Sequence, residues 1–240
     1  MIQRRFCILA LFLLGSPLSA GTSNSLIDIS PDGKTLLVTN SDNGTVSVVD
    51  LVAKKKLHEI PVGDKPEGVT WIGNGPLAVV TVYREDKLVF FNANQGKIAK
   101  TLKVDDEPYG IVANQAGTTA WVTHEYPGLV AEIDLKSQKV TRKLKVGSYI
   151  RGLGLSRDEK RLYVTEFYTS KLHGVDLKTG KVVDTFSGHS TGNLCRNVAI
   201  HPKRDKAYLP HIRSKIKAHH GDGSIFSHVS VCTLKPKKDV

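Results

Sequence analysis

The sequence predicts an all-β fold of repeated four-stranded antiparallel units, on three observations. Two apolar residues followed by threonine recur every 42 residues, at Thr39, Thr81, Thr123 and Thr165. An acidic or amide side chain recurs eleven residues further on, at Asp50, Asn92, Asp134 and Asp176. β-Branched and aromatic residues fill the expected strands, as sheet packing favours. A fixed period of this size with strand-like content is typical of a β-propeller with one repeat per blade.

The first element along the chain is a predicted signal peptide over residues 1–20. Arg4 and Arg5 give a basic start, residues 6–14 are apolar, and small residues precede the expected cleavage after Ala20. The apolar run is shorter than a membrane-spanning helix, and no other run is long and apolar enough to cross a bilayer. We therefore expect a periplasmic or secreted protein without a membrane span.

Each repeat after the signal peptide is interpreted as four short strands. In the fourth repeat these are expected at 150–155, 161–165, 171–177 and 181–186, with Gly180 in the tight turn before the last. The recurring threonines and Asp/Asn residues are expected to satisfy backbone groups and not to bind a ligand. The predicted blades cover residues 25–63, 64–104, 105–147, 148–188 and 189–240.

Several segments of the first repeat resemble the YVTN-type propeller repeat: Ser-Pro-Asp-Gly-Lys at 30–34, Leu-Val-Thr-Asn at 37–40, Val-Ser-Val-Val-Asp at 46–50 and Pro-Val-Gly at 61–63. The resemblance covers essentially the whole chain after the signal peptide and implies the propeller fold. It implies no particular function, because propellers carry unrelated activities on one scaffold.

Residues 209–214 are similar to a segment of exported propellers that accompany di-haem cytochrome peroxidase-like proteins. This second resemblance implies a haem protein as a partner and an accessory role in a periplasmic redox system. The chain itself contains no Cys-x-x-Cys-His, so we expect no covalently attached haem and no other cofactor.

The predicted ring is incomplete. Val240 aligns with the start of the fourth strand of the fifth repeat, which gives four complete blades and most of a fifth. An unclosed ring leaves bare sheet edges. We expect a fragment of a longer reading frame. Completion of the ring by another chain and a distorted five-bladed ring are the alternatives.

A candidate binding site is expected at one mouth of the central channel, where first strands begin and second strands end. A long insert over 212–227 is expected to overhang the same face. Acids, bases and guanidinium groups at a concave opening predict a binding site. The candidate residues are Glu67, Tyr109, Arg151 and Arg196 at strand starts, His124, Glu166 and His211 at strand ends, and Arg213, Lys215 and Lys217 in the insert.

The leading interpretation is a non-catalytic scaffold that binds an acidic protein partner or a small anionic ligand on its channel face. The formal net charge is +11, and +9 without Arg4 and Arg5, which favours acidic partners. His-Glu-x-x-His and a phosphate-binding glycine loop are both missing from the sequence.

Two alternative functions stay open. A resemblance to propellers that hydrolyse sugar lactones implies a lactonase-like hydrolase, with Glu166, His124 and Arg151 as acid, base and oxyanion partner. The positive charge also permits a propeller that binds polyanions or nucleic acid. No nucleic-acid motif and no interleaving of aromatic and basic residues supports the latter.

Histidines and cysteines give no predicted metal site or disulfide. The candidate metal ligands are His211, His219, His220 and His228, but their spacing fits no metal motif, so no metal is predicted. Cys195 and Cys232 lie on strands that the repeat register does not place side by side. We therefore expect packed free thiols instead of a disulfide.

Overall fold

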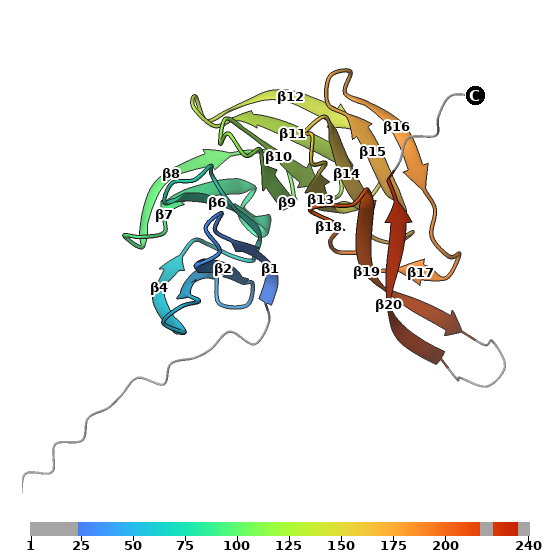
Figure 1. The fold of residues 1–240 in the computed structure, drawn as a ribbon, viewed down its shortest axis with the longest axis horizontal. Coiled ribbons are helices and arrows are strands. Elements are labelled where there is room, and N and C mark those ends of the chain that lie inside the picture. Colours follow the sequence, from blue (N-terminus) through green and yellow to red (C-terminus); the bar gives the residue numbers. More distant parts are fainter. Residues whose placement is uncertain (1–23, 217–222, 235–240) are drawn as a thin grey trace, which may run out of the picture.

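Period-two patterns of apolar residues along this chain form strands, which pair into five antiparallel sheets. The computed structural model describes residues 24–216 and 223–234. Its sheets are arranged as the blades of a β-propeller, with first strands on the inner side of an arc and fourth strands on the outer side (Figure 1). The predicted all-β propeller of four-stranded antiparallel blades is confirmed.

The first four sheets each follow the chain order from the inner to the outer strand. The first contains β1 (Asn24–Ile29), β2 (Thr35–Asn40), β3 (Thr45–Asp50) and β4 (Lys55–Pro61). The second contains β5 (Pro66–Trp71), β6 (Leu77–Val82), β7 (Lys87–Asn92) and β8 (Lys97–Lys103). The third contains β9 (Pro108–Ala113), β10 (Thr119–His124), β11 (Leu129–Asp134) and β12 (Lys139–Lys145). The fourth contains β13 (Ile150–Leu155), β14 (Arg161–Glu166), β15 (Leu172–Asp176) and β16 (Lys181–Phe186).

The fifth sheet departs from this plan. Two short strands, β17 (Gly192–Asn193) and β18 (Ala199–Ile200), pair with one edge of the long strand β19 (Lys206–Ile216), and β20 (Gly223–Thr233) pairs with its other edge. The prediction of a long insert that interrupts the strands over 212–227 is wrong for the described part of that range. There the β19–β20 ladder continues to Ile216 and Gly223. Apolar residues such as Ile212 and Ile225 make this segment compatible with strands.

Burial between consecutive blades holds the arc together. The buried apolar side chains form four clusters, and each cluster lies between one sheet and the next along the chain. Val79 of β6, for example, packs with Val122 of β10, and both are fully buried. Burying one such side chain contributes about 1.5–3 kcal/mol, so each blade depends on its neighbours for stability.

The recurring threonines connect the blades. The Thr81 hydroxyl accepts a hydrogen bond from the Gly68 N–H at 2.8 Å and donates one to the Tyr109 carbonyl at 2.7 Å. Gly68 permits this close approach, because a Cβ there would lie 2.4 Å from the Tyr109 carbonyl oxygen. Thr39, Thr123 and Thr165 make equivalent contacts to the next blade.

The recurring Asp and Asn side chains close the turn after each third strand, as predicted. Asp50 Oδ1 accepts the N–H groups of Val52 and Ala53, both at 2.8 Å. Asn92, Asp134 and Asp176 accept from the main chain three residues further on. No helix in the described part of the chain is long and apolar enough to cross a membrane.

Candidate functional site

The candidate site lies at the channel mouth, on the loops that follow the second strand of each blade. Main-chain bonds fix these loops against the linkers that enter the same blades: the Glu125 N–H donates to the Glu107 carbonyl at 3.1 Å, and the Phe167 N–H donates to the Tyr149 carbonyl at 2.9 Å. Side chains directly after the second strands therefore face the mouth together with those at the starts of the first strands.

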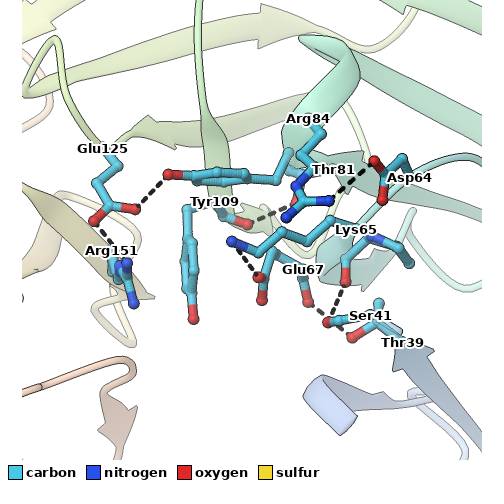
Figure 2. A network of polar contacts seen from close by, with 12 residues as sticks. Thr39, Ser41, Asp64, Lys65, Glu67, Thr81, Arg84, Tyr109, Glu125 and Arg151 are labelled. Atoms are coloured by element: carbon cyan, nitrogen blue, oxygen red, sulfur yellow. Dashed lines mark hydrogen bonds and ion pairs between the residues drawn. The ribbon is translucent and has the colours of Figure 1, made fainter. Parts of the chain in front are cut away.

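A buried ion pair forms the centre of the site (Figure 2). The Arg151 guanidinium lies 2.7 Å from Glu125 Oε1, and their side chains are only 13% and 5% exposed. The Tyr83 hydroxyl donates to the other Glu125 oxygen at 3.1 Å. Burial, and then the charges of Glu125 and Glu107, raise the pKa of Tyr83, so its hydroxyl remains a neutral donor.

Aromatic rings surround the Arg151 guanidinium, which lies 3.6 Å from the ring centre of Phe167 and 4.8 Å from that of Tyr109. Tyr109 also packs edge-to-face against Tyr83, with ring centres 6.2 Å apart. Cation–π contacts of this kind stabilise a guanidinium in addition to its ion pair, and they are stronger where the group is shielded from water. The positive charge of Arg151 is therefore compensated by Glu125, and its guanidinium is packed between side chains. It is not available to bind an acidic ligand.

Glu67 and Lys65 form a second pair beside this centre. Their charged groups lie 3.8 Å apart, and the Lys65 ammonium sits 4.1 Å from the centre of the Tyr83 ring. Figure 2 shows the side chains of Glu67, Tyr109 and Arg151 close to one another, and Glu67 and Tyr109 are only 4% and 1% exposed. The structure thus brings together three of the residues predicted at strand starts.

The predicted Arg196 is not the structural equivalent of Arg151. Thr165 donates to the carbonyl of Cys195, at a spacing of 30 residues, whereas the other three threonines reach 28 residues ahead. The extra residues lie in the irregular linker into the fifth blade. Cys195 therefore takes the position expected for Arg196, and Arg196 is exposed, with its guanidinium 5.9 Å from the Phe167 ring centre.

The predicted strand-end residues His124 and Glu166 are buried and have their own separate contacts. His124 is fully buried, and its Nδ1 lies 3.0 Å from the Asp106 carbonyl. Burial lowers the pKa of His124. Glu166 accepts from the Thr169 hydroxyl at 2.6 Å and lies 3.1 Å from His173 Nε2.

These environments do not assemble the lactonase-type trio. Glu166, His124 and Arg151 each have their own separate set of contacts. Burial raises the pKa of Glu166, but hydrogen bonds from Thr169, His173 and the Ser148 N–H outweigh it and hold that pKa below its usual value. A lowered pKa is unsuited to a general acid at neutral pH.

The predicted residues of the fifth blade lie along the β19–β20 hairpin. His211 is buried, its Nε2 lies 2.8 Å from the Ser230 hydroxyl, and its ring stacks on His228 at 6.0 Å. Arg213 is half-buried and Lys215 lies on β19, while Lys217, His219 and His220 fall outside the described residues. Among the side chains that are described, no three His, Cys, Asp or Glu residues form a potential metal site.

Sequence reasoning missed a row of exposed tyrosines on this face, Tyr126, Tyr149 and Tyr168, here called the tyrosine row. Their exposed fractions are 70%, 42% and 56%. Neighbouring rings meet edge-to-face, with centres 6.1 and 5.1 Å apart, and Tyr168 lies 4.8 Å from Phe167. Tyr126 and Tyr168 are 42 residues apart, so a comparison of equivalent loop positions in successive repeats could have identified them.

Two hollows lie near this face. A cavity of about 190 Å³ in the channel is lined by the first strands of the first four blades, including Asp28 and Thr70, and by Asn197 and Val198 between β17 and β18. It is smaller than the roughly 300 Å³ of typical ligand pockets. Another hollow, of about 350 Å³, lies beside Tyr126 and has the carboxylates Asp86, Asp106 and Glu107 in its lining. The charge of the face is therefore mixed.

Comparison with known proteins supports the fold. The structure is similar to a chain of hydrazine synthase from Kuenenia stuttgartiensis, with 23% sequence identity, a TM-score of 0.76 and 87% of this chain covered. It is also similar to a chain in the Mitotic Checkpoint Complex, with 16% identity, a TM-score of 0.66 and 89% covered. This chain spans 62% and 66% of those two chains. No family model matches the sequence, and no curated protein matches it significantly.

Proposed function

We propose that this chain is an exported, non-catalytic propeller scaffold that binds a partner protein on its channel face. The tyrosine row is the observation that carries the proposal. Tyrosines are enriched at protein interfaces because they bury a large area at a small cost in side-chain entropy. Three neighbouring, exposed tyrosine rings on a rigid β scaffold fit the centre of such an interface better than an ordinary solvated loop surface.

Charge adds to this surface on one side. Arg196 is exposed beside Phe167, at the end of the row opposite Tyr126, and the net charge of the chain is positive. An acidic segment of a partner would meet Arg196, while the carboxylates near Tyr126 would oppose acidic groups at the other end. We place the acidic part of the partner over the fourth and fifth blades for this reason.

The cellular setting of the proposal rests on the sequence. The signal peptide predicted over residues 1–20 supports export to the periplasm, and the resemblance of residues 209–214 supports a haem protein as the partner. An accessory role in a periplasmic redox system follows from the two together. The similarity to the hydrazine synthase chain contributes the fold alone, at 23% identity.

A binding comparison tests the proposal. Immobilised protein is exposed to a periplasmic extract of the source organism, and captured proteins are quantified by mass spectrometry for four forms of the chain: the original, Tyr126→Ala/Tyr168→Ala, Arg196→Glu and the control Val52→Ala. Val52 is 72% exposed in the turn after β3, at the opposite face of the propeller.

We expect the double tyrosine variant to lose a specific captured protein by at least about tenfold, since two interface aromatics commonly contribute 2 kcal/mol or more. Arg196→Glu should reduce capture of the same protein, and Val52→Ala should leave its capture unchanged. Equal capture by the original chain and the tyrosine variant would contradict the proposal.

A further inference from the structure

Arg213 on β19 is a half-buried arginine without a counter-charge in the described part of the chain. Its guanidinium forms no hydrogen bond or ion pair with any described residue, and its Nε is buried without a partner. Burying a charged group is costly unless it is paired and hydrogen-bonded. This arginine therefore favours a bound anion.

The arginine faces the junction between the fourth and fifth blades. Leu209, on the same strand, packs in one cluster with Tyr163 and Leu172 of the fourth blade. Alternate residues of a strand share a face, so His211 and Arg213 are directed to the same side as Leu209. The feature thus lies where two consecutive described blades meet.

A glycine leaves room beside Arg213 at this junction. Gly192 of β17 pairs with Arg213, and a Cβ on Gly192 would lie 3.3 Å from Ser170 Oγ and 3.4 Å from His211 Cε1. Ser170 comes from the loop between β14 and β15 and is only 4% exposed, yet its hydroxyl has no hydrogen-bond partner among the described residues. Buried polar groups are normally paired, so a second unsatisfied donor lies at the same place.

Two histidines add to this group. His189 Nδ1 accepts the Thr191 N–H at 3.2 Å, which places the ring proton of the neutral imidazole on Nε2, where it can be donated. His228 of β20 stacks on His211, with ring centres 6.0 Å apart. Partial desolvation, and then the charges of Arg213, His211 and His189, lower the pKa of His228. The charged and titratable groups that act on His228 are therefore all basic.

We infer that Arg213, His228 and His189 bind a free tetrahedral oxyanion, inorganic phosphate or sulfate, at the junction of the fourth and fifth blades. A guanidinium matches two oxygens of such an anion. The other donors come from three further segments, which suits an anion with oxygens in four directions better than a flat carboxylate.

This site goes beyond the proposed partner binding. It uses neither the tyrosine row nor Arg196, so variants of those residues do not test it. Failure of the anion site would leave the proposed partner binding intact, and the reverse also holds.

Sulfate is the probe of choice, because it remains a dianion between pH 5.5 and 8. Isothermal titration calorimetry with the purified full chain, at constant ionic strength, measures its affinity for the original protein, Arg213→Gln, His228→Gln and the control Arg204→Gln. Arg204 is an exposed arginine in the bend before β19, at the other end of this strand from Arg213. Thermal melting checks that each variant folds.

Arg213→Gln should weaken sulfate binding by at least about tenfold, as expected for lost hydrogen bonds to a charged group, and Arg204→Gln should leave it unchanged. Binding by Arg213→Gln as tight as by the original, or an equal loss in both arginine variants, would overturn the inference. So would the lack of saturable sulfate binding to the original protein up to about 20 mM. Acetate that binds as tightly as sulfate would overturn the assignment to a tetrahedral anion.

His228→Gln provides a test that does not depend on the folding of the arginine variant. A bound dianion favours the charged imidazole, so the original protein should bind sulfate at least about fivefold more tightly at pH 5.5 than at pH 8. His228→Gln should lose most of this difference while retaining the affinity at pH 8. The same pH dependence in the original protein and in His228→Gln would show that His228 does not contact the anion and would overturn its place in the site.

Discussion

Thr123 Oγ1 donates a 2.7 Å hydrogen bond to the main-chain carbonyl of Arg151, which lies 28 residues later in the next blade. The same oxygen accepts the Gly110 N–H at 2.8 Å. One hydroxyl therefore ties the first strands of two blades together and fixes the backbone of the arginine at the centre of the candidate site. The repeat motif and the site are physically linked at this atom.

Replacing Thr123 by valine should destabilise the protein by about 1–3 kcal/mol, because the buried Gly110 N–H and Arg151 carbonyl lose a partner without any change in side-chain volume. Urea unfolding measures the change. Thr141→Val is the control, since Thr141 is exposed and its bond to the Glu132 carbonyl is 3.2 Å long. Equal unfolding free energies for the two variants would show that the two hydrogen bonds of the Thr123 hydroxyl do not stabilise the protein.

Breaking the buried Arg151–Glu125 ion pair should lower the unfolding free energy far more than breaking an exposed pair. Glu125→Gln leaves the Arg151 charge buried without its counter-charge, which we expect to cost about 3–5 kcal/mol of unfolding free energy. The exposed pair of Arg157 and Asp205, 2.9 Å apart with side chains 50% and 45% exposed, provides the control. Asp205→Asn should cost less than about 1 kcal/mol.

A double-mutant cycle isolates the pair itself. Arg151→Met combined with Glu125→Gln should be less destabilised than the sum of the single changes, because no unpaired charge remains. Strict additivity in urea unfolding experiments would mean that the two charges do not stabilise each other in the folded state.

The fold followed from the sequence because a constant period fixes both strand content and register. The site followed only in part. His124 and Glu166 were chosen as the last residues of second strands, yet the residues one position later, Glu125 and Phe167, face the mouth. Successive side chains of a strand point to opposite sides, so an error of one residue replaced the neighbours of Arg151 by side chains with other contacts. Burial does not separate the two sets, because Glu125 and Phe167 are themselves only 4% and 5% exposed.

The fifth blade could not be placed by the period alone. Two added residues between Thr165 and Cys195 shift the register, and an irregular segment separates β17 from β18. Such changes in a linker carry no periodic signal, which is why Arg196 was assigned the position of Cys195. The tyrosine row was missed for a different reason, because its members lie in loops outside the strand pattern.

Buried His124 predicts a loss of stability in mild acid. Its Nδ1 hydrogen donates to the Asp106 carbonyl, and its buried Nε2 has no hydrogen-bond partner, so the folded protein holds it neutral. Burial lowers its pKa from the ordinary value of 6.5. The unfolded chain therefore takes up the proton first, and the stabilising contribution, present above pH 6.5, is lost as the pH falls below it.

His124→Gln tests this contribution, since glutamine keeps a donor but does not titrate in this range. We expect the unfolding free energy of the original chain to fall more between pH 7.5 and 5.5 than that of the variant, by up to about 1.4 kcal/mol for each pH unit below 6.5. Parallel pH profiles from urea titrations would contradict a neutral, buried imidazole.

Cys195 should be an unreactive thiol in the folded protein. Burial raises its pKa to about 12, and the neighbouring Cys232 adds to the effect against weaker opposing hydrogen bonds from Thr165 and Asn197. Because only the thiolate reacts, its labelling at pH 8 should be at least about 100-fold slower in the native state than in guanidinium chloride, where the pKa is near 8.5. A variant with Cys7→Ser and Cys232→Ser isolates this thiol for measurement with a chromogenic disulfide reagent. Rapid labelling of the native variant would show that the linker into the fifth blade opens readily, and that the packing of Cys195 between the fourth and fifth blades is not maintained in solution.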